Sequence, residues 1–230
     1  MSAFPHGHSL LHEFPQHIVT ELLRDARPMV LSKGDVLFTR GDADDSCYLV
    51  RRGVIKVSIA SSSGEQRILT LHGRGAIVGE LAMIDGLPRA VTAQAISDCQ
   101  LAAITRAAFM ACMAKHPEMG QALITILVGR LRRAGEEAAW AGLLPAKARV
   151  ARALLRVASV LGQPAGPGRM SIDRSVTHAD IAAMAGVSRE VASRAIGSWK
   201  RSGAMSGDPH SSFIVDVRAL QGEANDGTSS

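Results

Sequence analysis

Aromatic residues are scarce in this chain of 230 residues, at 3% of the total, and long apolar runs are absent. A helix needs about 20 consecutive apolar residues to cross a bilayer, and no segment approaches that length. The N-terminus also lacks the basic region and the apolar core of a signal peptide. We therefore expect a cytoplasmic protein with no membrane partner.

Cysteine is scarcer still, and Cys47, Cys99 and Cys112 are odd in number and widely spaced. This spacing suggests neither a disulfide framework nor a metal-binding knuckle. His6 and His8 could chelate a metal, but histidines near a chain end are usually solvated. The sequence also lacks a nucleophile–base set and a Walker loop, so we expect no enzyme and no metal.

Positive charge is concentrated towards the C-terminus. Residues 1–145 hold 15 Lys and Arg against 14 Asp and Glu, whereas residues 146–218 hold 11 against 5. A local excess of this kind is expected where a protein meets a polyanion, although many basic domains are merely soluble.

Short Val-, Ile- and Leu-rich runs alternate with glycine turns between residues 29 and 105, which is typical of a closed or sandwiched antiparallel β unit. The expected strands are 29–31, 36–38, 47–51, 54–60, 67–71, 90–95 and 99–104. Helical spacing and proline positions predict helices over 10–24 (with a kink near Pro15), 106–116, 118–143 and 145–161. The fold class is therefore α+β.

One stretch, residues 78–92, suggests a binding site. It places a carboxylate, Glu80, directly after Gly79 and a guanidinium, Arg89, nine residues later. Gly79 lets backbone approach a ligand, and the N–H groups of residues 80–82 would open a helical turn that points at an anion. Arg89 can bind a phosphate with paired hydrogen bonds, whereas Glu80 would repel a phosphate and suits a sugar hydroxyl. The spacing fits a nucleotide, but an ordinary ion pair at a turn has the same pattern.

The order Gly-Glu-Leu-Ala, a short linker and Pro-Arg-Ala-x-Thr resembles the phosphate-binding cassette of cyclic-nucleotide-binding domains. The resemblance implies that Glu80 holds the ribose 2′-hydroxyl, that Arg89 holds the cyclic phosphate and that Ala90 lies beside it. It also implies a jelly-roll-like antiparallel β-roll over residues 1–117. The candidate nucleotide-binding residues are Gly79, Glu80, Leu81, Ala82, Arg89 and Ala90.

Residues 176–201 have the pattern of a helix-turn-helix. Thr177 gives an N-cap signal, Gly186 permits a sharp turn, and Ser188 caps a second helix. In a recognition helix, N-terminal Arg side chains suit guanine and Glu can accept from cytosine. A helical hairpin with solvated charges would share this pattern. The candidate DNA-binding residues are Thr177, Ser188, Arg189, Glu190, Ser193 and Arg194.

From about residue 10 to 218 the chain resembles the Crp/Fnr family of bacterial regulators. The resemblance implies a long dimerisation helix over 118–144 and a winged helix-turn-helix domain over 145–221, with base-reading roles for Arg189, Glu190 and Arg194. A long helix buried in its own domain is the alternative. Residues 222–230 are polar, and we expect them to be disordered. The implied partners are double-stranded DNA, a second copy of the chain and RNA polymerase, for which no patch stands out.

The chain departs from the family at the positions that contact the base of the cyclic nucleotide. The family's best-known member reads adenine with a Thr-Ser pair in the long helix, and the matching positions here are Ala134 and Gly135. Neither has a side-chain hydroxyl. Arg132, Arg133 and Trp140 are nearby candidates for a base contact.

The sequence therefore predicts a homodimeric transcription regulator that binds cAMP or cGMP and, in response, two-fold symmetric DNA sites. One alternative is a regulator of the same family that acts without nucleotide or senses another signal. Scattered cysteines argue against an iron–sulfur cluster, and His72 is a conceivable haem ligand without other support. Another alternative is a nucleotide-binding module that acts on a protein partner.

Overall fold

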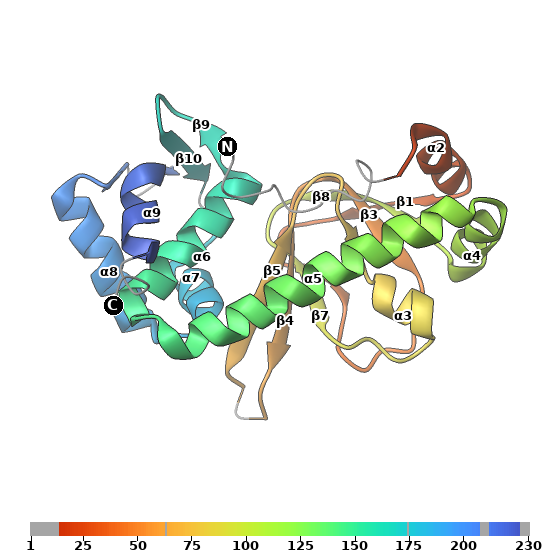
Figure 1. Cartoon of the computed structure of the whole chain (residues 1–230), viewed down its shortest axis with the longest axis horizontal. Coiled ribbons are helices and arrows are strands. Elements are labelled where there is room, and N and C mark those ends of the chain that lie inside the picture. The colour runs from red at the N-terminus through yellow and green to blue at the C-terminus, as the bar shows by residue number, and fades with distance from the viewer. Residues whose placement is uncertain (1–13, 63, 174, 208–211, 226–230) are drawn as a thin grey trace. The chain divides into compact units, whose positions relative to one another are not determined.

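The computed structural model describes residues 14–62, 64–173, 175–207 and 212–225 (Figure 1). Within these ranges, residues 14–61 and 69–133 belong to one compact unit, the N-terminal unit, and residues 62, 64–68 and 134–225 belong to another, the C-terminal unit. The boundaries between the units fall inside the strand 66–72 and the helix 117–143. His6 and His8 lie outside the described residues. No described helix is long and apolar enough to cross a membrane.

Two four-stranded antiparallel sheets form the β-roll of the N-terminal unit. Its strands are β1 (Arg27–Leu31), β2 (Val36–Phe38), β3 (Cys47–Arg52), β4 (Ile55–Ala60), β5 (Gln66–His72), β6 (Ile77–Val78), β7 (Thr92–Ala95) and β8 (Cys99–Ile104). The strand orders are β1-β8-β3-β6 and β2-β7-β4-β5. Each predicted strand is present within two residues at either end, and the short β6 is an addition.

Four helices accompany the sheets of this unit. They are α2 (Gln16–Arg24), α3 (Glu80–Asp85), α4 (Arg106–Lys115) and α5 (Pro117–Leu143). The predicted kink near Pro15 is wrong, because Pro15 is the N-cap of α2 and lies outside the helix. A proline fits this position because it has no N–H to donate. Residues 10–13 of the predicted helix lie outside the described residues.

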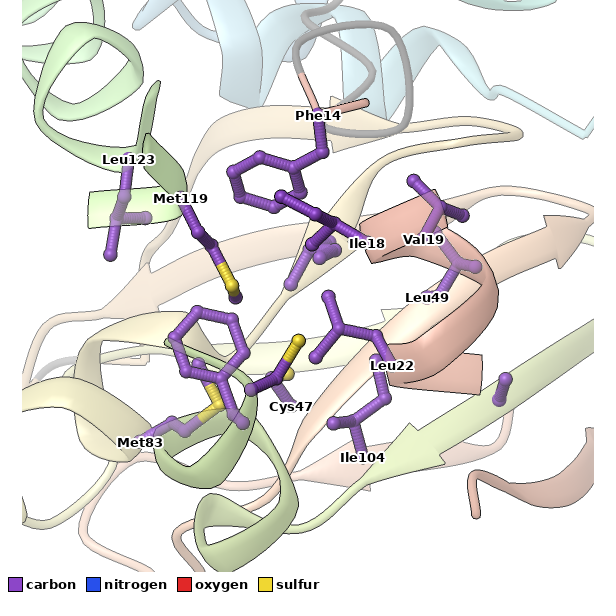
Figure 2. Packing of buried hydrophobic residues seen from close by; sticks show 14 of the residues in the cluster. Phe14, Ile18, Val19, Leu22, Cys47, Leu49, Met83, Ile104, Met119 and Leu123 are labelled. Carbon is purple, nitrogen blue, oxygen red and sulfur yellow. The ribbon is translucent and has the colours of Figure 1, made fainter. Parts of the chain in front are cut away.

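Strand β3 contributes to two layers of the core. Tyr48 and Val50 pack between the two sheets, whereas Cys47 and Leu49 pack beneath the helices. Figure 2 shows Cys47 and Leu49 among side chains from α2 and from the start of α5. Successive side chains of a strand point to opposite faces, so this one strand joins both layers.

The apolar residues of α5 divide between two directions. Leu123 and Ile126 are buried in the N-terminal unit, whereas Ile124 is 64% exposed and Leu131 is 74% exposed. The apolar stripe that runs along this helix through residues 123, 126, 127 and 131 is therefore only partly internal. The first half of the stripe anchors the helix to its own unit and the exposed residues face away from that core.

The C-terminal unit combines helices with a small sheet. Its elements are α6 (Ala146–Leu161), β9 (Gln163–Pro164), β10 (Arg169–Asp173), α7 (His178–Ala185), α8 (Arg189–Ser202), β11 (Met205–Ser206), β12 (Ser212–Asp216) and α9 (Val217–Asn225). The sheet has the order β11-β12-β10-β9. The predicted disordered tail is wrong over residues 222–225, because α9 packs on α6 and buries Leu220 and Ala224. The rest of that tail lies outside the described residues.

Candidate functional site

Glu80 and Arg89 are both buried in the N-terminal unit, at 6% and 2% exposure. Glu80 is the first residue of α3, and Arg89 lies in the loop after it. An ionised carboxylate or guanidinium is costly to bury unless it is paired and hydrogen-bonded. The partners of these two groups therefore define the site.

Protein acceptors surround the Arg89 guanidinium. Its Nη1 donates to the Gly79 carbonyl at 2.8 Å, and its Nη2 donates to Asp44 Oδ2 and to the Ser46 carbonyl. The guanidinium carbon lies 4.1 Å from the centre of the Phe38 ring, which adds a cation–π contact. Nε is buried and has no hydrogen-bond partner among the described residues.

Position 79 requires a glycine because the Arg89 side chain lies against its Cα atom. A Cβ atom at this position would lie 2.5 Å from Arg89 Nη1, and Gly79 has a φ of +89°, which other residues rarely adopt. From the sequence we expected a ligand to make this close approach, whereas in the structure the neighbour is the guanidinium itself. The glycine and the arginine thus form one local arrangement.

Asp44 was not predicted from the sequence, where it lies among other acidic residues of a turn. Burial alone would raise the pKa of Asp44, but hydrogen bonds from the Ser46 N–H, Arg89 and the Tyr48 hydroxyl hold it below its usual value. The first and last of these bonds are 3.0 and 2.9 Å long. Asp44 is therefore ionised at neutral pH and neutralises Arg89.

Glu80 forms an ion pair with Arg130 of α5. Arg132 and Arg133 were candidates from the sequence but Arg130 was missed, although it continues the buried Leu123–Ile126 stripe by one helical turn. Burial, with a smaller effect of the nearby Arg130 charge, lowers the pKa of His72 to about 3. His72 is therefore neutral, and Arg130 is the cation that holds the Glu80 carboxylate.

The other candidates in this stretch differ in exposure. Ala82 is buried, whereas Leu81 and Ala90 are exposed. Gly135 on α5 is also exposed. Trp140, considered above as a base contact, instead has the Arg152 guanidinium 4.7 Å from its ring, within the C-terminal unit.

Helices α7 and α8 form the predicted helix-turn-helix. The Thr177 side chain accepts from the Asp180 N–H at 3.1 Å, and the Asp180 carboxylate accepts from the Thr177 N–H, which completes a capping box. Gly186 ends α7 with a φ of +60°, and Ser188 caps α8 by accepting from the Val191 N–H at 3.3 Å. Residue types at three positions therefore set both ends of α7 and the start of α8.

A residue of α6 holds the turn between these helices. Arg149 Nη1 donates to the Gly186 carbonyl at 3.1 Å. This contact could not be predicted from the sequence, because a basic residue on α6 is indistinguishable from its solvated neighbours until the helices pack.

One face of α8 is buried and the other carries charge. The buried residues are Ala192, Ala195, Ile196 and Trp199. Arg189, Glu190 and Arg194 are exposed, and Ser193 is half-buried beside His178 Nδ1 at 3.4 Å. Hydrogen bonds from its own backbone N–H and from Ser188 lower the pKa of Glu190, so its carboxylate is an ionised acceptor. Strands β11 and β12 pair beside α8 as the predicted wing.

Two protein families match this chain in separate parts. Residues 28–116 match the cyclic nucleotide-binding domain, and residues 148–223 match the Crp-like helix-turn-helix domain. The first match contains the Glu80–Arg89 stretch and the second contains the helix-turn-helix. Each match covers one of the two motifs described above.

Similarity to known proteins extends over most of the chain. A cyclic AMP receptor protein of Thermus thermophilus is 30% identical over 215 residues, which cover 94% of this chain and 96% of that protein. A CRP-like cAMP-activated global transcriptional regulator of Mycobacterium tuberculosis is 27% identical over 202 residues, or 88% and 90% of the two chains. The fold is similar to that of FixK2 from Bradyrhizobium japonicum, with a TM-score of 0.75, 21% identity and coverage of 86% and 96%. The chain therefore belongs to the Crp/Fnr family of transcription regulators, which are not enzymes, and combines a cyclic-nucleotide-binding domain with a DNA-binding helix-turn-helix domain.

Proposed function

We propose that this protein is a cytoplasmic, homodimeric regulator whose affinity for two-fold symmetric DNA depends on a cyclic mononucleotide, cAMP or cGMP. The observation that carries the proposal is the burial of Glu80 and Arg89 in one short turn. A carboxylate and a guanidinium kept out of water in a nucleotide-binding fold are suited to a ribose hydroxyl and a phosphate.

Arg89 is placed to exchange the Asp44 carboxylate for the phosphate of a bound nucleotide. Its Nη2 is paired with the Asp44 carboxylate, whose side chain is 38% exposed, and its Nε is buried without a partner among the described residues. A cyclic phosphate offers oxygens to both groups, and Asp44 can return to water when it is displaced. Glu80, held by Arg130, keeps acceptor capacity for the ribose 2′-hydroxyl because a carboxylate can accept several hydrogen bonds.

The exposed face of α5 supports a homodimer. Ile124, Val128 and Leu131 recur at helical spacing and are all exposed in the single chain. An apolar helix face of this kind is suited to pairing with its twin about a two-fold axis. Two recognition helices would then be related by the same axis, as a palindromic DNA site requires.

DNA binding in the presence of nucleotide tests the proposal directly. The purified protein would be titrated with cAMP and with cGMP while its retention of a random-sequence DNA pool is followed. We expect at least one of the two nucleotides to increase retention. Specific DNA binding that neither nucleotide alters would favour a regulator of another signal, and nucleotide binding without specific DNA binding would favour a module that acts on a protein partner.

The preferred DNA site should be two-fold symmetric, with half-sites about 34–36 Å apart or a multiple of this distance. We expect G and C at the reading positions, because Arg189 and Arg194 suit guanine and Glu190 suits cytosine. In sites selected from the random pool, Arg194→Ala should relax the preference at one position by about 1–3 kcal/mol. Arg201→Ala, a change near the C-terminal end of α8, should leave the preference intact. Selected sites without two-fold symmetry would contradict this prediction.

Discrimination between cAMP and cGMP should be weak. The adenine amino group is a donor and the guanine O6 is an acceptor, but Ala134 and Gly135 present no side-chain polar atom to either. We expect the two affinities to differ by no more than the roughly 1–3 kcal/mol of one hydrogen bond. Arg132, if it contacts the base, would favour guanine. Competition binding measures the ratio, and a cAMP preference of about a thousandfold, or 4 kcal/mol, would show that other residues read the base.

A further inference from the structure

A second cluster of polar side chains lies in the N-terminal unit, where α2 meets the turn between α4 and α5. His17 and Glu21 are one helical turn apart on α2, His116 is in the turn, and Glu118 is in the first turn of α5. Helices α2 and α4 pack against each other (Figure 1). The cluster shares no residue with the Glu80–Arg89 site.

Three potential ligand atoms of this cluster converge. Glu118 Oε1 lies 3.5 Å from His116 Nδ1 and 3.9 Å from His17 Nε2, and all three atoms lie within 4.8 Å of one another. Zinc ligands stand about 2.0–2.2 Å from the metal, so the ligand atoms of a tetrahedral site are about 3.4 Å apart. The two distances from Glu118 Oε1, 3.5 and 3.9 Å, are close to this value, and small side-chain rotations would bring all three atoms to it.

The other ring nitrogen of His116 forms a hydrogen bond with Glu21. Nε2 lies 2.9 Å from Glu21 Oε2, and Glu21 Oε1 also accepts from Lys115 at 2.9 Å. These hydrogen bonds, that of Lys115 first, lower the pKa of Glu21 to about 2, so its carboxylate is ionised. When Nε2 donates its hydrogen to Glu21, the lone pair of Nδ1 is available to a metal ion.

We propose that His17, His116 and Glu118 bind a divalent transition-metal ion of the zinc type. His17 Nε2, His116 Nδ1 and Glu118 Oε1 are its ligands, and water occupies the fourth position. Glu21 is a positioning residue, because a ligating histidine commonly donates its other N–H to a carboxylate, which fixes the ring. His17 and Glu118 are exposed, so a hydrated ion can reach the site. The ion joins α2 to the start of α5.

A second set of potential metal ligands, Glu21, Cys112 and His116, overlaps this site and must be distinguished from it. Cys112 Sγ lies within 4.8 Å of ligand atoms of Glu21 and His116, and this alternative would use Glu21 as a ligand. Cys112 is buried, at 3% exposure, whereas His17 and Glu118 are exposed and can be reached by a hydrated ion. The two sites therefore differ in whether His17 or Cys112 binds the ion.

Zinc titration of the full-length protein, with its affinity tag removed and after chelator treatment, tests the proposal in competition with a chromophoric chelator. We expect one ion per chain. His17→Ala and His116→Ala should each weaken binding by at least tenfold, and Glu21→Gln should weaken it by about 10–100-fold while retaining all three ligands. The His6→Ala/His8→Ala double variant and Cys112→Ser are the matched controls and should retain the affinity. Far-UV circular dichroism checks that each variant is folded.

Cobalt provides an independent readout of the ligands. The cobalt-loaded protein should show visible ligand-field bands without the near-ultraviolet charge-transfer band of a thiolate ligand. Absence of stoichiometric binding, or affinity unchanged by the exposed-site change His17→Ala, would overturn the proposal. Loss of binding in Cys112→Ser or in the His6→Ala/His8→Ala variant would overturn it too, because the ion would then be elsewhere.

Discussion

Arg89→Leu is expected to abolish binding of cyclic nucleotide while the chain still folds. Two charge-assisted hydrogen bonds to a phosphate, at about 1.5–3 kcal/mol each, correspond to a loss of roughly 10²–10⁴ in affinity. Leucine can still pack on Phe38, and Asp44 is exposed enough to regain water, so the β-roll should survive. Isothermal titration calorimetry with cAMP and cGMP measures the loss, and thermal unfolding monitors the fold.

Two companion variants separate phosphate binding from a structural role. Arg89→Lys retains the charge but not the forked geometry, so its affinity should lie between that of the unchanged protein and that of Arg89→Leu. Asp44→Asn removes the anion that competes with phosphate and should tighten binding, since Arg89 then loses its charged partner in the free protein. Unchanged nucleotide affinity in Arg89→Leu would refute the assignment. Lower stability of Asp44→Asn without tighter binding would mean that the ion pair does not compete with the ligand.

Ile124→Glu combined with Leu131→Glu is expected to convert the proposed dimer into monomers. Across a two-fold axis each new carboxylate would approach its own copy, and juxtaposed like charges at an interface cost several kcal/mol. We expect the dimer dissociation constant to rise by at least about 100-fold, which corresponds to some 2.7 kcal/mol. Sedimentation equilibrium measures it. DNA affinity should fall in parallel, because a monomer engages one half-site.

The chain contains well-matched controls for this change. Leu87 is as exposed as Ile124, at 64%, and Val30 is as exposed as Leu131, at 74%, but neither lies on α5. Leu87→Glu combined with Val30→Glu should therefore leave the dimer intact. A dimer that persists in the α5 variant would exclude this face as the interface, and dissociation in the control would indicate a different one.

Local features of the chain were predictable from the sequence because neighbouring residues determine them. Thr177, Gly186 and Ser188 set both ends of α7 and the start of α8 through caps and a left-handed turn, which depend on residue type at a few positions. The strands followed from short apolar runs between glycine turns, and Glu80 and Arg89 were recognisable from their order in one short stretch. The same reasoning failed at residues 222–225, where packing on α6 gives a polar segment a helix.

Contacts between distant parts of the chain were decided only by the tertiary structure. Asp44 reaches Arg89 from a turn before β3, and Arg130 reaches Glu80 from the middle of α5. His17 and His116 come from opposite ends of the N-terminal unit's sequence and meet in a T-shaped arrangement, with 5.3 Å between ring centres. Sequence spacing reports on neighbours along one helix or strand, whereas these pairs depend on how α2, the sheets and α5 pack around a shared core. The sequence by itself determined which motifs this protein carries, and the packing decided which charges hold them in place.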